Sequence, residues 1–399
     1  MAASPESMYT REFAEDPHAA YERWRREHGP LVPVELTPGV RATLVLGYAT
    51  ALRILNDPGN FPADPRTWQA SVPSGCPVLP LMQWRPNALH SSGSEHQRYR
   101  SATVAALETV DLHGMHTVVE RIALPLIEEF GTRGGAHHTL GGADLLEQYI
   151  YPLVYRVLDF LLGFDADTGE RIGAGMAMIF DSAADAATGN AMMTAAMSEH
   201  IERKRARPGA DITSHLITRS DLSTEELIHQ LSTLYGGGSE PQAHLISNTL
   251  LLMMTDNRFA GDLISGSLST RDALDEVLFS NPPLANFCMT YPRQPILIDG
   301  VWLPAHQPVL ISMAAGNTDP AIHSENQPRF GNRAHLSWGA GPHQCPARQL
   351  GYQIAMDAID QLLDFVPDMK LAVPESDLTW RPGPFHRALE SLPVVFPSG

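Results

Sequence analysis

Near its C-terminal end the chain reads Ser337-Trp338-Gly339-Ala340-Gly341-Pro342-His343-Gln344-Cys345-Pro346-Ala347-Arg348. The two glycines allow the backbone to turn tightly against a flat ligand, because glycine carries no Cβ. Pro346 suits the first position of a helix, which we expect to run from about Gln349 to Phe365. The amide groups at the start of that helix would point toward the Cys345 sulfur and favour its ionised form. The stretch therefore predicts a thiolate ligand for a soft metal.

A buried cysteine in a glycine-rich turn is the alternative interpretation of this stretch taken alone. Its spacing nevertheless resembles the heme-binding signature of the cytochrome P450 heme-thiolate monooxygenases. The resemblance implies one bound heme b, with Cys345 as the iron ligand. It also implies heme contacts from the other positions of the signature, which are Trp338, Gly339, Gly341, His343 and Ala347. Phenylalanine is usual at the first of these positions and glycine at the last.

A second cofactor-binding pattern lies in the first third of the chain. His96 and Arg100 are four residues apart, so a helix presents both on one face. Two cationic groups on one face can hold a dianionic ligand, although a solvated charged face is the alternative. In the family that the Cys345 stretch resembles, this His-x-x-x-Arg pattern contacts the heme propionates.

A long helix is expected from Ser223 to about Thr255, beginning with a capping box formed by Ser223 and Glu226. Its centre, Gly236 to Gln242, contains three glycines and a proline, which would break an ordinary helix. We therefore expect a kink around Gly236 to Pro241, which a ligand lying against the helix would justify. A loop between two helices is the alternative. In the family, this segment lies over the heme, and an acid-alcohol pair delivers protons to bound dioxygen.

The resemblance places catalytic positions within the centre of this long helix. They are Gly237, Gly238, Glu240, Pro241 and Gln242. Glu240 keeps the acid, whereas Pro241 and Gln242 stand where threonines are usual. The alcohol is therefore missing.

The family also has a Glu-x-x-Arg ion pair, of which this chain keeps Glu276 but has Phe279 in place of the arginine. Because a buried unpaired carboxylate is costly, we expect Glu276 to find another partner, with Arg329 and Arg333 as candidates. Phe279 should fill the vacated volume by packing.

One further family position departs from the pattern. Thr290 stands where an arginine often meets a heme propionate, and Arg293 is a candidate substitute. The combined departures resemble an actinomycete subgroup that lacks the Glu-x-x-Arg arginine and is often encoded beside small GTPase operons.

Composition limits the class of partner and the compartment. The chain has 399 residues with 28 Lys and Arg against 45 Asp and Glu, a net charge of −17, which argues against nucleic acid as a partner. Cys76, Cys288 and Cys345 are widely separated and odd in number, so neither a disulfide framework nor a zinc site is expected. With no signal peptide and no membrane-spanning run in the sequence, we expect a cytoplasmic protein without a membrane partner.

Helical spacing dominates the chain, and no linker interrupts it, so residues 1–399 are expected to form one mainly α domain with a small β portion. A helix between Asp16 and Gly29 should be followed by a β-hairpin, Leu31–Val34 with Ala42–Leu46. A helix from Tyr48 to Leu55 and a long proline-rich loop from Phe61 to Ala88 should come next. The resemblance to the cytochrome P450 fold extends over nearly the whole chain.

The resemblance implies oxidation of a small, mostly apolar molecule with dioxygen, or with peroxide, and electrons from a ferredoxin and an NAD(P)H-dependent ferredoxin reductase. The donor should dock near Cys345 on a basic patch of Arg348 with Arg98 or Arg100. The alternative is a heme-binding regulatory or scaffold protein with little turnover, associated with a GTPase-type signalling operon.

Overall fold

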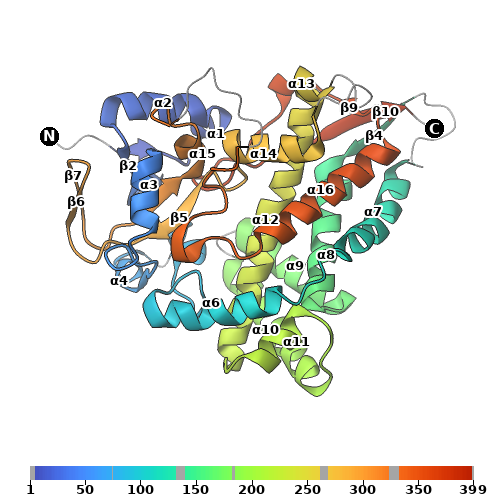
Figure 1. The fold of residues 1–399 in the computed structure, drawn as a ribbon, viewed down its shortest axis with the longest axis horizontal. Coiled ribbons are helices and arrows are strands. Elements are labelled where there is room, and N and C mark those ends of the chain that lie inside the picture. Colours follow the sequence, from blue (N-terminus) through green and yellow to red (C-terminus); the bar gives the residue numbers. More distant parts are fainter. Residues whose placement is uncertain are drawn as a thin grey trace.

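The computed structural model describes residues 5–73, 75–131, 140–181, 185–260, 268–322 and 332–397. Helices make up most of these residues, as Figure 1 shows. The longer helices are α2 (Pro17–His28), α3 (Tyr48–Leu55), α6 (Gly93–Leu107), α7 (Met115–Gly131), α8 (Tyr151–Leu162), α9 (Ala166–Asp181), α10 (Ala186–Ala206), α11 (Ile212–Arg219), α12 (Thr224–Thr255), α14 (Thr270–Ser280) and α16 (Arg348–Phe365). The short helices are α1 (Arg11–Glu15), α4 (Arg66–Gln69), α5 (Leu79–Met82), α13 (Asn257–Ala260), α15 (Met313–Asn317), the π-helix η1 (Leu146–Ile150) and the 3₁₀ helices η2 (Gly341–His343) and η3 (Glu375–Asp377).

Small sheets accompany these helices. Five strands pair in the order β1-β2-β3-β8-β5, with bounds β1 (Glu6–Ser7), β2 (Leu31–Thr37), β3 (Val40–Val45), β8 (Val309–Ser312) and β5 (Asn286–Thr290). A second sheet has the order β4-β10-β9, with bounds β4 (Leu140–Asp144), β10 (Pro393–Pro397) and β9 (Lys370–Leu371), and β6 (Ile296–Ile298) forms a hairpin with β7 (Val301–Leu303). The predicted fold class, mainly α with a small β portion, is confirmed.

The N-terminal third follows the predicted order of helix, hairpin and helix. Asp16 caps α2 by accepting a hydrogen bond from the amide of Ala19, and α3 spans the predicted residues. The segment from Phe61 to Ala88 differs from the prediction of a plain loop, because it contains α4 and α5. Trp68 and Met82 on these short helices are buried in the core beside the five-stranded sheet, and this packing holds turns that the sequence pattern did not indicate.

Helix α12 runs through the middle of the molecule (Figure 1). The predicted capping box is present. The amide of Glu226 donates to the Ser223 hydroxyl oxygen, and the amide of Ser223 donates to the Glu226 carboxylate. The helix continues without interruption through Gly236 and Pro241, so the glycines do not form a loop between two helices. Because Pro241 has no amide hydrogen, the carbonyl of Gly237 lacks its usual donor in the helix. A kink at this point remains a prediction.

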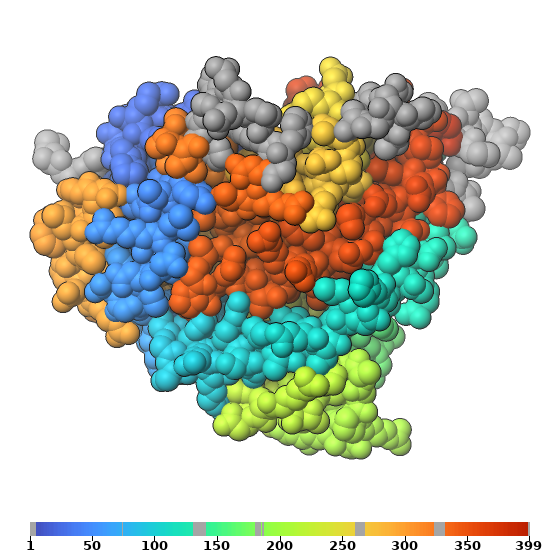
Figure 2. Space-filling view, in the orientation of Figure 1, coloured from blue at the N-terminus to red at the C-terminus, as the bar shows by residue number. Residues whose placement is uncertain are grey.

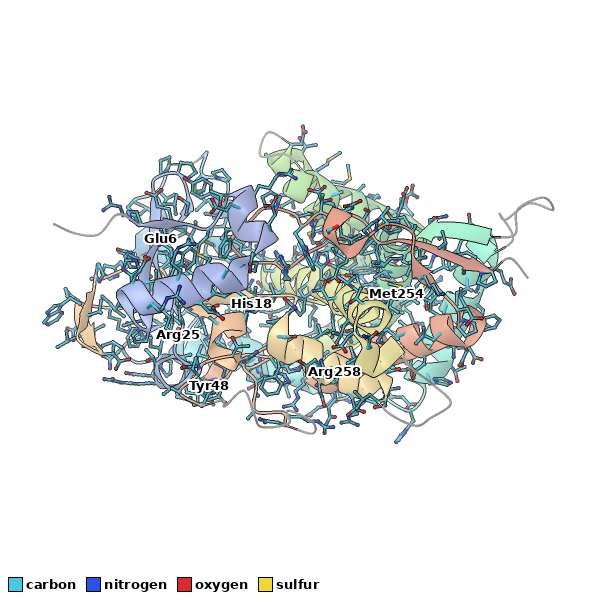
Figure 3. The ribbon with its side chains drawn as sticks, turned by 90° about the horizontal axis from the view of Figure 1, so that it is seen from above. Glu6, His18, Arg25, Tyr48, Met254 and Arg258 are labelled. Atoms are coloured by element: carbon cyan, nitrogen blue, oxygen red, sulfur yellow. The ribbon has the colours of Figure 1, made fainter. Side chains whose placement is uncertain are left out.

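The carboxylates of helix α14 have different partners from those expected, which were Arg329 or Arg333 for Glu276. Arg333 donates from Nε to Asp275 at 3.1 Å, so it pairs with the residue before Glu276, and Arg329 lies outside the described residues. Glu276 lies 3.9 Å from Arg258, which is seen just beyond the end of α12 (Figure 3). Phe279 is 1% exposed and packs edge-to-face against His335 with ring centroids 5.3 Å apart. Phe279 therefore fills its site by packing, as predicted.

Truncation of this packing residue should destabilise the fold. Phe279→Ala should lower the free energy of unfolding by about 3–5 kcal/mol, the usual cost of removing a buried aromatic ring. Phe365→Ala is the matched control, because Phe365 is 55% exposed and its loss should change stability by only about 0.5 kcal/mol. Denaturant unfolding of both variants measures the difference. Equal stability of the two would show that Phe279 does not brace α14.

Candidate functional site

The loop of residues 337–348, called the heme loop below, is shaped by its backbone. Gly339 and Gly341 have φ values of +69° and +67°, which residues with side chains rarely adopt. The amide of Cys345 donates to the carbonyl oxygen of Trp338 at 2.7 Å and closes the turn. A Cβ on Gly341 would lie 2.2 Å from the carbonyl oxygen of Leu55 at the end of α3, so only glycine fits there. The sequence indicated that these glycines let the loop pass close to a ligand. At Gly341, the group that comes close is the backbone carbonyl of Leu55.

The Cys345 sulfur lies at the start of α16, as predicted. Burial raises the pKa of its thiol, while the amide of Ala347 and the charge of Arg100 act to lower it. The helix start therefore favours the thiolate, but burial outweighs it, and a bound cation would supply the remaining stabilisation. Figure 2 shows the segment that carries this loop (orange to red) crossing the middle of one face between α3 (blue) and α6 (cyan).

Four basic side chains, His90, His96, Arg100 and His343, form what we call the basic cluster. The rings of His96 and His343 have centroids 4.1 Å apart, and Arg100 donates to the carbonyl of Gln344 at 2.5 Å. Burial, with the neighbouring His96 and Arg100, lowers the pKa of His343 to about 3. The predicted face of α6 is therefore turned toward the heme loop.

The basic cluster has no anionic partner among the described residues. Within the described ranges, none of its side chains has a carboxylate partner, and His96 Nε2 is buried without a hydrogen bond. Buried polar groups normally have partners, so this cluster indicates a missing anionic ligand. The two propionates of heme b, beside an iron bound by Cys345, match this donor set. The residues present thus fit the cofactor.

His90 was not predicted from the sequence. It lies six residues before His96 and just before α6 begins, and no spacing rule connects the two. Thr290, at the position of the family's propionate arginine, has a buried hydroxyl without a partner among the described residues. Arg293, the candidate substitute, is exposed and donates from Nε to the carbonyl of Gly59 at 2.8 Å, and its role toward a propionate stays a prediction.

The glycines of α12 leave one open place on the helix. Gly237 is exposed, and a Cβ built there would meet no atom within 4 Å. One residue later, a Cβ on Gly238 would lie 2.9 Å from Cδ2 of Leu158 on α8. Gly237 therefore leaves room for a ligand, whereas Gly238 permits close packing of two helices.

Glu240 is held in a buried ion cluster with Arg381, His244 and Tyr151. His244 Nε2 lies 2.8 Å from Glu240 Oε2 and 2.6 Å from Arg381 Nη2, and Arg381 also donates to Glu240. Burial raises the pKa of Glu240, but the bond to His244 and the charge of Arg381 outweigh it and lower the pKa to about 2. Glu240 is thus an ionised partner of Arg381.

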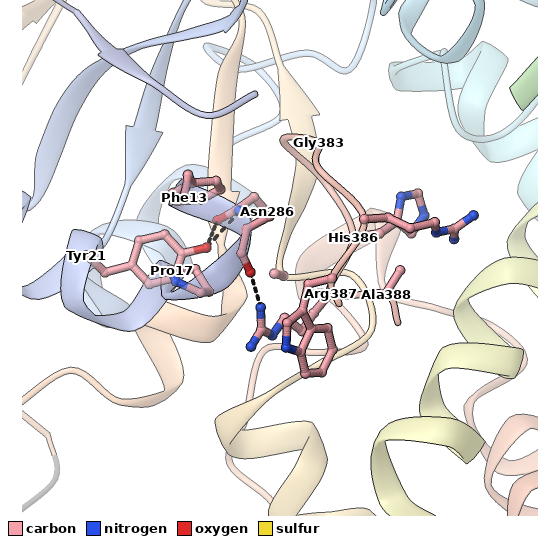
Figure 4. A pocket seen from close by; sticks show the side chains of 12 residues that line it. Phe13, Pro17, Tyr21, Asn286, Gly383, His386, Arg387 and Ala388 are labelled. Atoms are coloured by element: carbon pink, nitrogen blue, oxygen red, sulfur yellow. Dashed lines mark hydrogen bonds between the residues drawn. The ribbon is translucent and has the colours of Figure 1, made fainter. Parts of the chain in front are cut away.

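Arg381 comes from a C-terminal hairpin, residues 380–389, that packs against the N-terminal helices. The hairpin turns near Gly383, and its Arg387 donates to the carbonyl of Ala14 (Figure 4). Asn286 joins it to α2 by accepting from the hydroxyl of Tyr21 at 3.0 Å and donating to the carbonyl of Pro384 at 3.0 Å. The two ends of the chain thereby fix the position of Arg381.

The residues after Glu240 do not supply a hydroxyl. Gln242 Nε2 donates to the carbonyl of Gly351 on α16 at 3.0 Å. The indole of Trp338 is also next to Gly351, since its Cη2 lies 3.0 Å from the position of a Cβ there. Gln242 thus ties α12 to the helix that follows the heme loop.

The loop, the basic cluster and the open glycine on α12 define a heme-thiolate protein. No protein-family model matches the chain. Over 92% of its length the chain is 29% identical to 2-hydroxy-5-methyl-1-naphthoate 7-hydroxylase of Streptomyces carzinostaticus, of which it covers 92%. Over 97% of its length it is 29% identical to the cytochrome P450 monooxygenase PikC of Streptomyces venezuelae, covering 93% of that protein.

Solved structures agree with these relatives. CYP154C4 from Streptomyces sp. W2061 matches with a TM-score of 0.88 at 23% identity over 98% of both chains. The ligand-free P450 monooxygenase TamI matches with a TM-score of 0.80 at 26% identity, over 98% of this chain and 94% of that one. The chain is therefore similar over nearly its whole length to cytochrome P450 monooxygenases, and the comparisons support a heme b oxidoreductase of this kind. Among the described residues, no helix is long and apolar enough to span a membrane.

Replacement of the predicted iron ligand provides the first test of the site. Cys345→Ala should abolish the red-shifted thiolate band of the reduced carbon monoxide complex. Cys76 lies outside the heme loop, and burial raises the pKa of Cys288, whose sulfur packs beside Gly339, to about 12. Cys76→Ala and Cys288→Ala should keep the band. Difference spectra of the three variants, at equal protein concentration, measure the effect. A persistent band in Cys345→Ala would assign the iron to another ligand.

The Glu240 ion cluster should make stability depend on pH. A carboxylate whose folded pKa lies near 2, against an ordinary value of 4.5, contributes roughly 3 kcal/mol above the ordinary pKa and loses it as pH falls toward the folded value. Glu240→Gln should therefore be less stable than the unmodified protein at neutral pH, and the gap should narrow as pH falls to about 3. Denaturant unfolding across this range gives the comparison.

The control for this titration is Glu375→Gln, which changes an exposed glutamate. Its unfolding free energy should follow that of the unmodified protein at every pH. A constant gap for Glu240→Gln from neutral to acidic pH would mean that Glu240 is not the ionised member of the cluster.

Proposed function

We propose that this protein hydroxylates a small, mostly apolar molecule with dioxygen or with peroxide. The observation that carries the proposal is the combination of the Cys345 loop with a basic cluster that has no anionic partner in the described part of the chain. Heme, once bound, supplies the activation of dioxygen, and the protein supplies binding and orientation. One relative is named a hydroxylase of a naphthoate and another a monooxygenase, which supports hydroxylation as the reaction.

Electrons are proposed to come from a ferredoxin and its NAD(P)H-dependent reductase, docked on the face that carries the heme loop. Arg98 adds no free charge to that face, because it pairs with Glu226 at 2.7 Å and with Asp221 at 3.1 Å. Arg100 is turned inward to the carbonyl of Gln344. The patch proposed for the donor therefore reduces to Arg348, which has no carboxylate partner within the described residues and is partly exposed.

Activation of dioxygen needs protons, and the two residues expected to deliver them do not do so. Pro241 carries no hydroxyl, and Glu240 is bound to Arg381 and His244, so neither side chain has a proton to donate in this arrangement. Peroxide already carries the two protons and two electrons that dioxygen must gain. A reaction with peroxide therefore does not need Glu240 and Pro241 to deliver protons. We therefore propose that peroxide supports the reaction better than dioxygen with reduced ferredoxin does.

The preference for peroxide can be tested by measuring how much product forms per electron consumed. The ratio of hydroxylated product to NADH consumed should be low with dioxygen, while peroxide should give product without NADH. Pro241→Thr, which restores a hydroxyl beside Glu240, should raise the ratio, and Pro38→Thr in the distant β2–β3 turn should not. Oxygen uptake, NADH loss and product are measured together.

Two results would contradict the proposal. A ratio near one in the unmodified enzyme would mean that another group delivers protons efficiently. No product with either oxidant, from protein with an intact thiolate band and a panel of small apolar molecules, would favour a heme-binding protein with little turnover.

A further inference from the structure

An aromatic pair connects the heme loop to α16. Trp338, seven residues before Cys345, has its ring centroid 5.7 Å from that of Tyr352, and the two ring planes are inclined by 38°. Gly351, the neighbour of Tyr352, has no side chain, and this leaves the space that the indole occupies. The indole Nε1 is buried without a hydrogen-bond partner among the described residues. The indole is thus next to the phenol with no hydrogen bond of its own.

The Tyr352 hydroxyl has a base as its partner. It donates to Oδ1 of Asp275 on α14, and Oδ2 of Asp275 accepts from Nε of Arg333 at 3.1 Å. The side chain of Asp275 is 9% exposed and that of Arg333 is 42% exposed. Trp338, Tyr352, Asp275 and Arg333 therefore form a continuous series of contacts from the heme loop to the surface.

This arrangement has the parts of a redox-active tyrosine. Indole and phenol are the protein side chains that most readily lose one electron besides thiols, and a phenol loses its electron far more easily when a base takes its proton. Burial and the Asp275 contact raise the pKa of Tyr352 above its usual range, so the phenol keeps its proton at neutral pH. A carboxylate hydrogen-bonded to it supplies the acceptor that oxidation needs.

We propose that Trp338 and Tyr352 carry one oxidising equivalent from the heme to the surface, with Asp275 as the proton acceptor. One electron leaves Tyr352, passes through Trp338 and reduces the oxidised cofactor. The phenolic proton moves along the hydrogen bond to Asp275, giving a neutral tyrosyl radical and a protonated aspartic acid. A thiol reductant in solution returns one electron, and the proton returns from Asp275 to the phenolate oxygen.

The inference rests on the proposed function, because the oxidant is the dioxygen or peroxide of that reaction. The same reasoning gives it a purpose: if Pro241 and the bound Glu240 leave oxygen activation without protons, uncoupled turnover releases peroxide, and peroxide then oxidises the heme when no substrate is bound. Transfer to Tyr352 would remove these oxidising equivalents before they damage the heme.

The test is rapid-freeze electron paramagnetic resonance of the ferric holoprotein mixed with hydrogen peroxide in the absence of substrate. The unmodified protein should give a tyrosyl radical, and Tyr352→Phe should lose it. Trp338→Phe keeps an aromatic ring in the heme loop and should also lose most of the signal. Asp275→Asn removes the proton acceptor and should do the same, with heme content and thermal unfolding confirming that each variant is folded.

Two control variants make the assignment specific. Tyr149→Phe removes a buried tyrosine whose hydroxyl donates to the carbonyl of Ala358, which cannot accept a proton, and should keep the radical. Tyr99→Phe removes a tyrosine that also donates to a carboxylate, Glu226 at 3.0 Å, and should keep it too. A nitroso spin trap followed by peptide mapping should place the adduct on Tyr352.

The outcomes separate this inference from the proposed function. Two results would overturn the proposed electron path, provided that peroxide changes the heme spectrum. One is a radical signal that persists in Tyr352→Phe, and the other is a radical signal that is lost in Tyr99→Phe. Faster bleaching of the heme by peroxide in Tyr352→Phe than in Tyr149→Phe would support its protective role, and equal bleaching would remove that role. A protein whose heme does not react with peroxide would overturn the proposed function first.

Discussion

The approach of Gly341 to the carbonyl of Leu55 constrains the rest of the site. No side chain fits between the heme loop and the end of α3 at Gly341. The loop therefore lies directly against the end of α3 and turns through positive φ angles. The hydrogen bond from the Cys345 amide to the Trp338 carbonyl then fixes the direction of the cysteine. The basic cluster and α16 are arranged around a sulfur whose position is set by this backbone packing together with the bond from Arg100 to the carbonyl of Gln344.

Local patterns in the sequence were sufficient where the interaction itself is local. The capping box of Ser223 and Glu226, the α3 bounds and the face shared by His96 and Arg100 all depend on residues within one helical turn. The mainly α fold followed from the same periodicity. These features could be predicted because neighbours in the chain determine them.

The remaining features depend on contacts between distant segments. Arg381 reaches Glu240 from a hairpin fixed by the N-terminal helices, and no spacing rule links residues so far apart. His244 could have been found, because it lies one helical turn after Glu240. Arg333 was expected to bind Glu276, and this was wrong: it binds Asp275, since the choice between adjacent residues depends on how the helix is rotated against the loop.

The central claim is that the structure is organised around a single sulfur bound to heme iron. X-ray absorption at the iron edge of the purified, substrate-free holoprotein tests it most directly, because it reports the atoms bound to iron without assuming activity. The account predicts one sulfur ligand together with the four porphyrin nitrogens. A first coordination sphere containing only nitrogen and oxygen would contradict it.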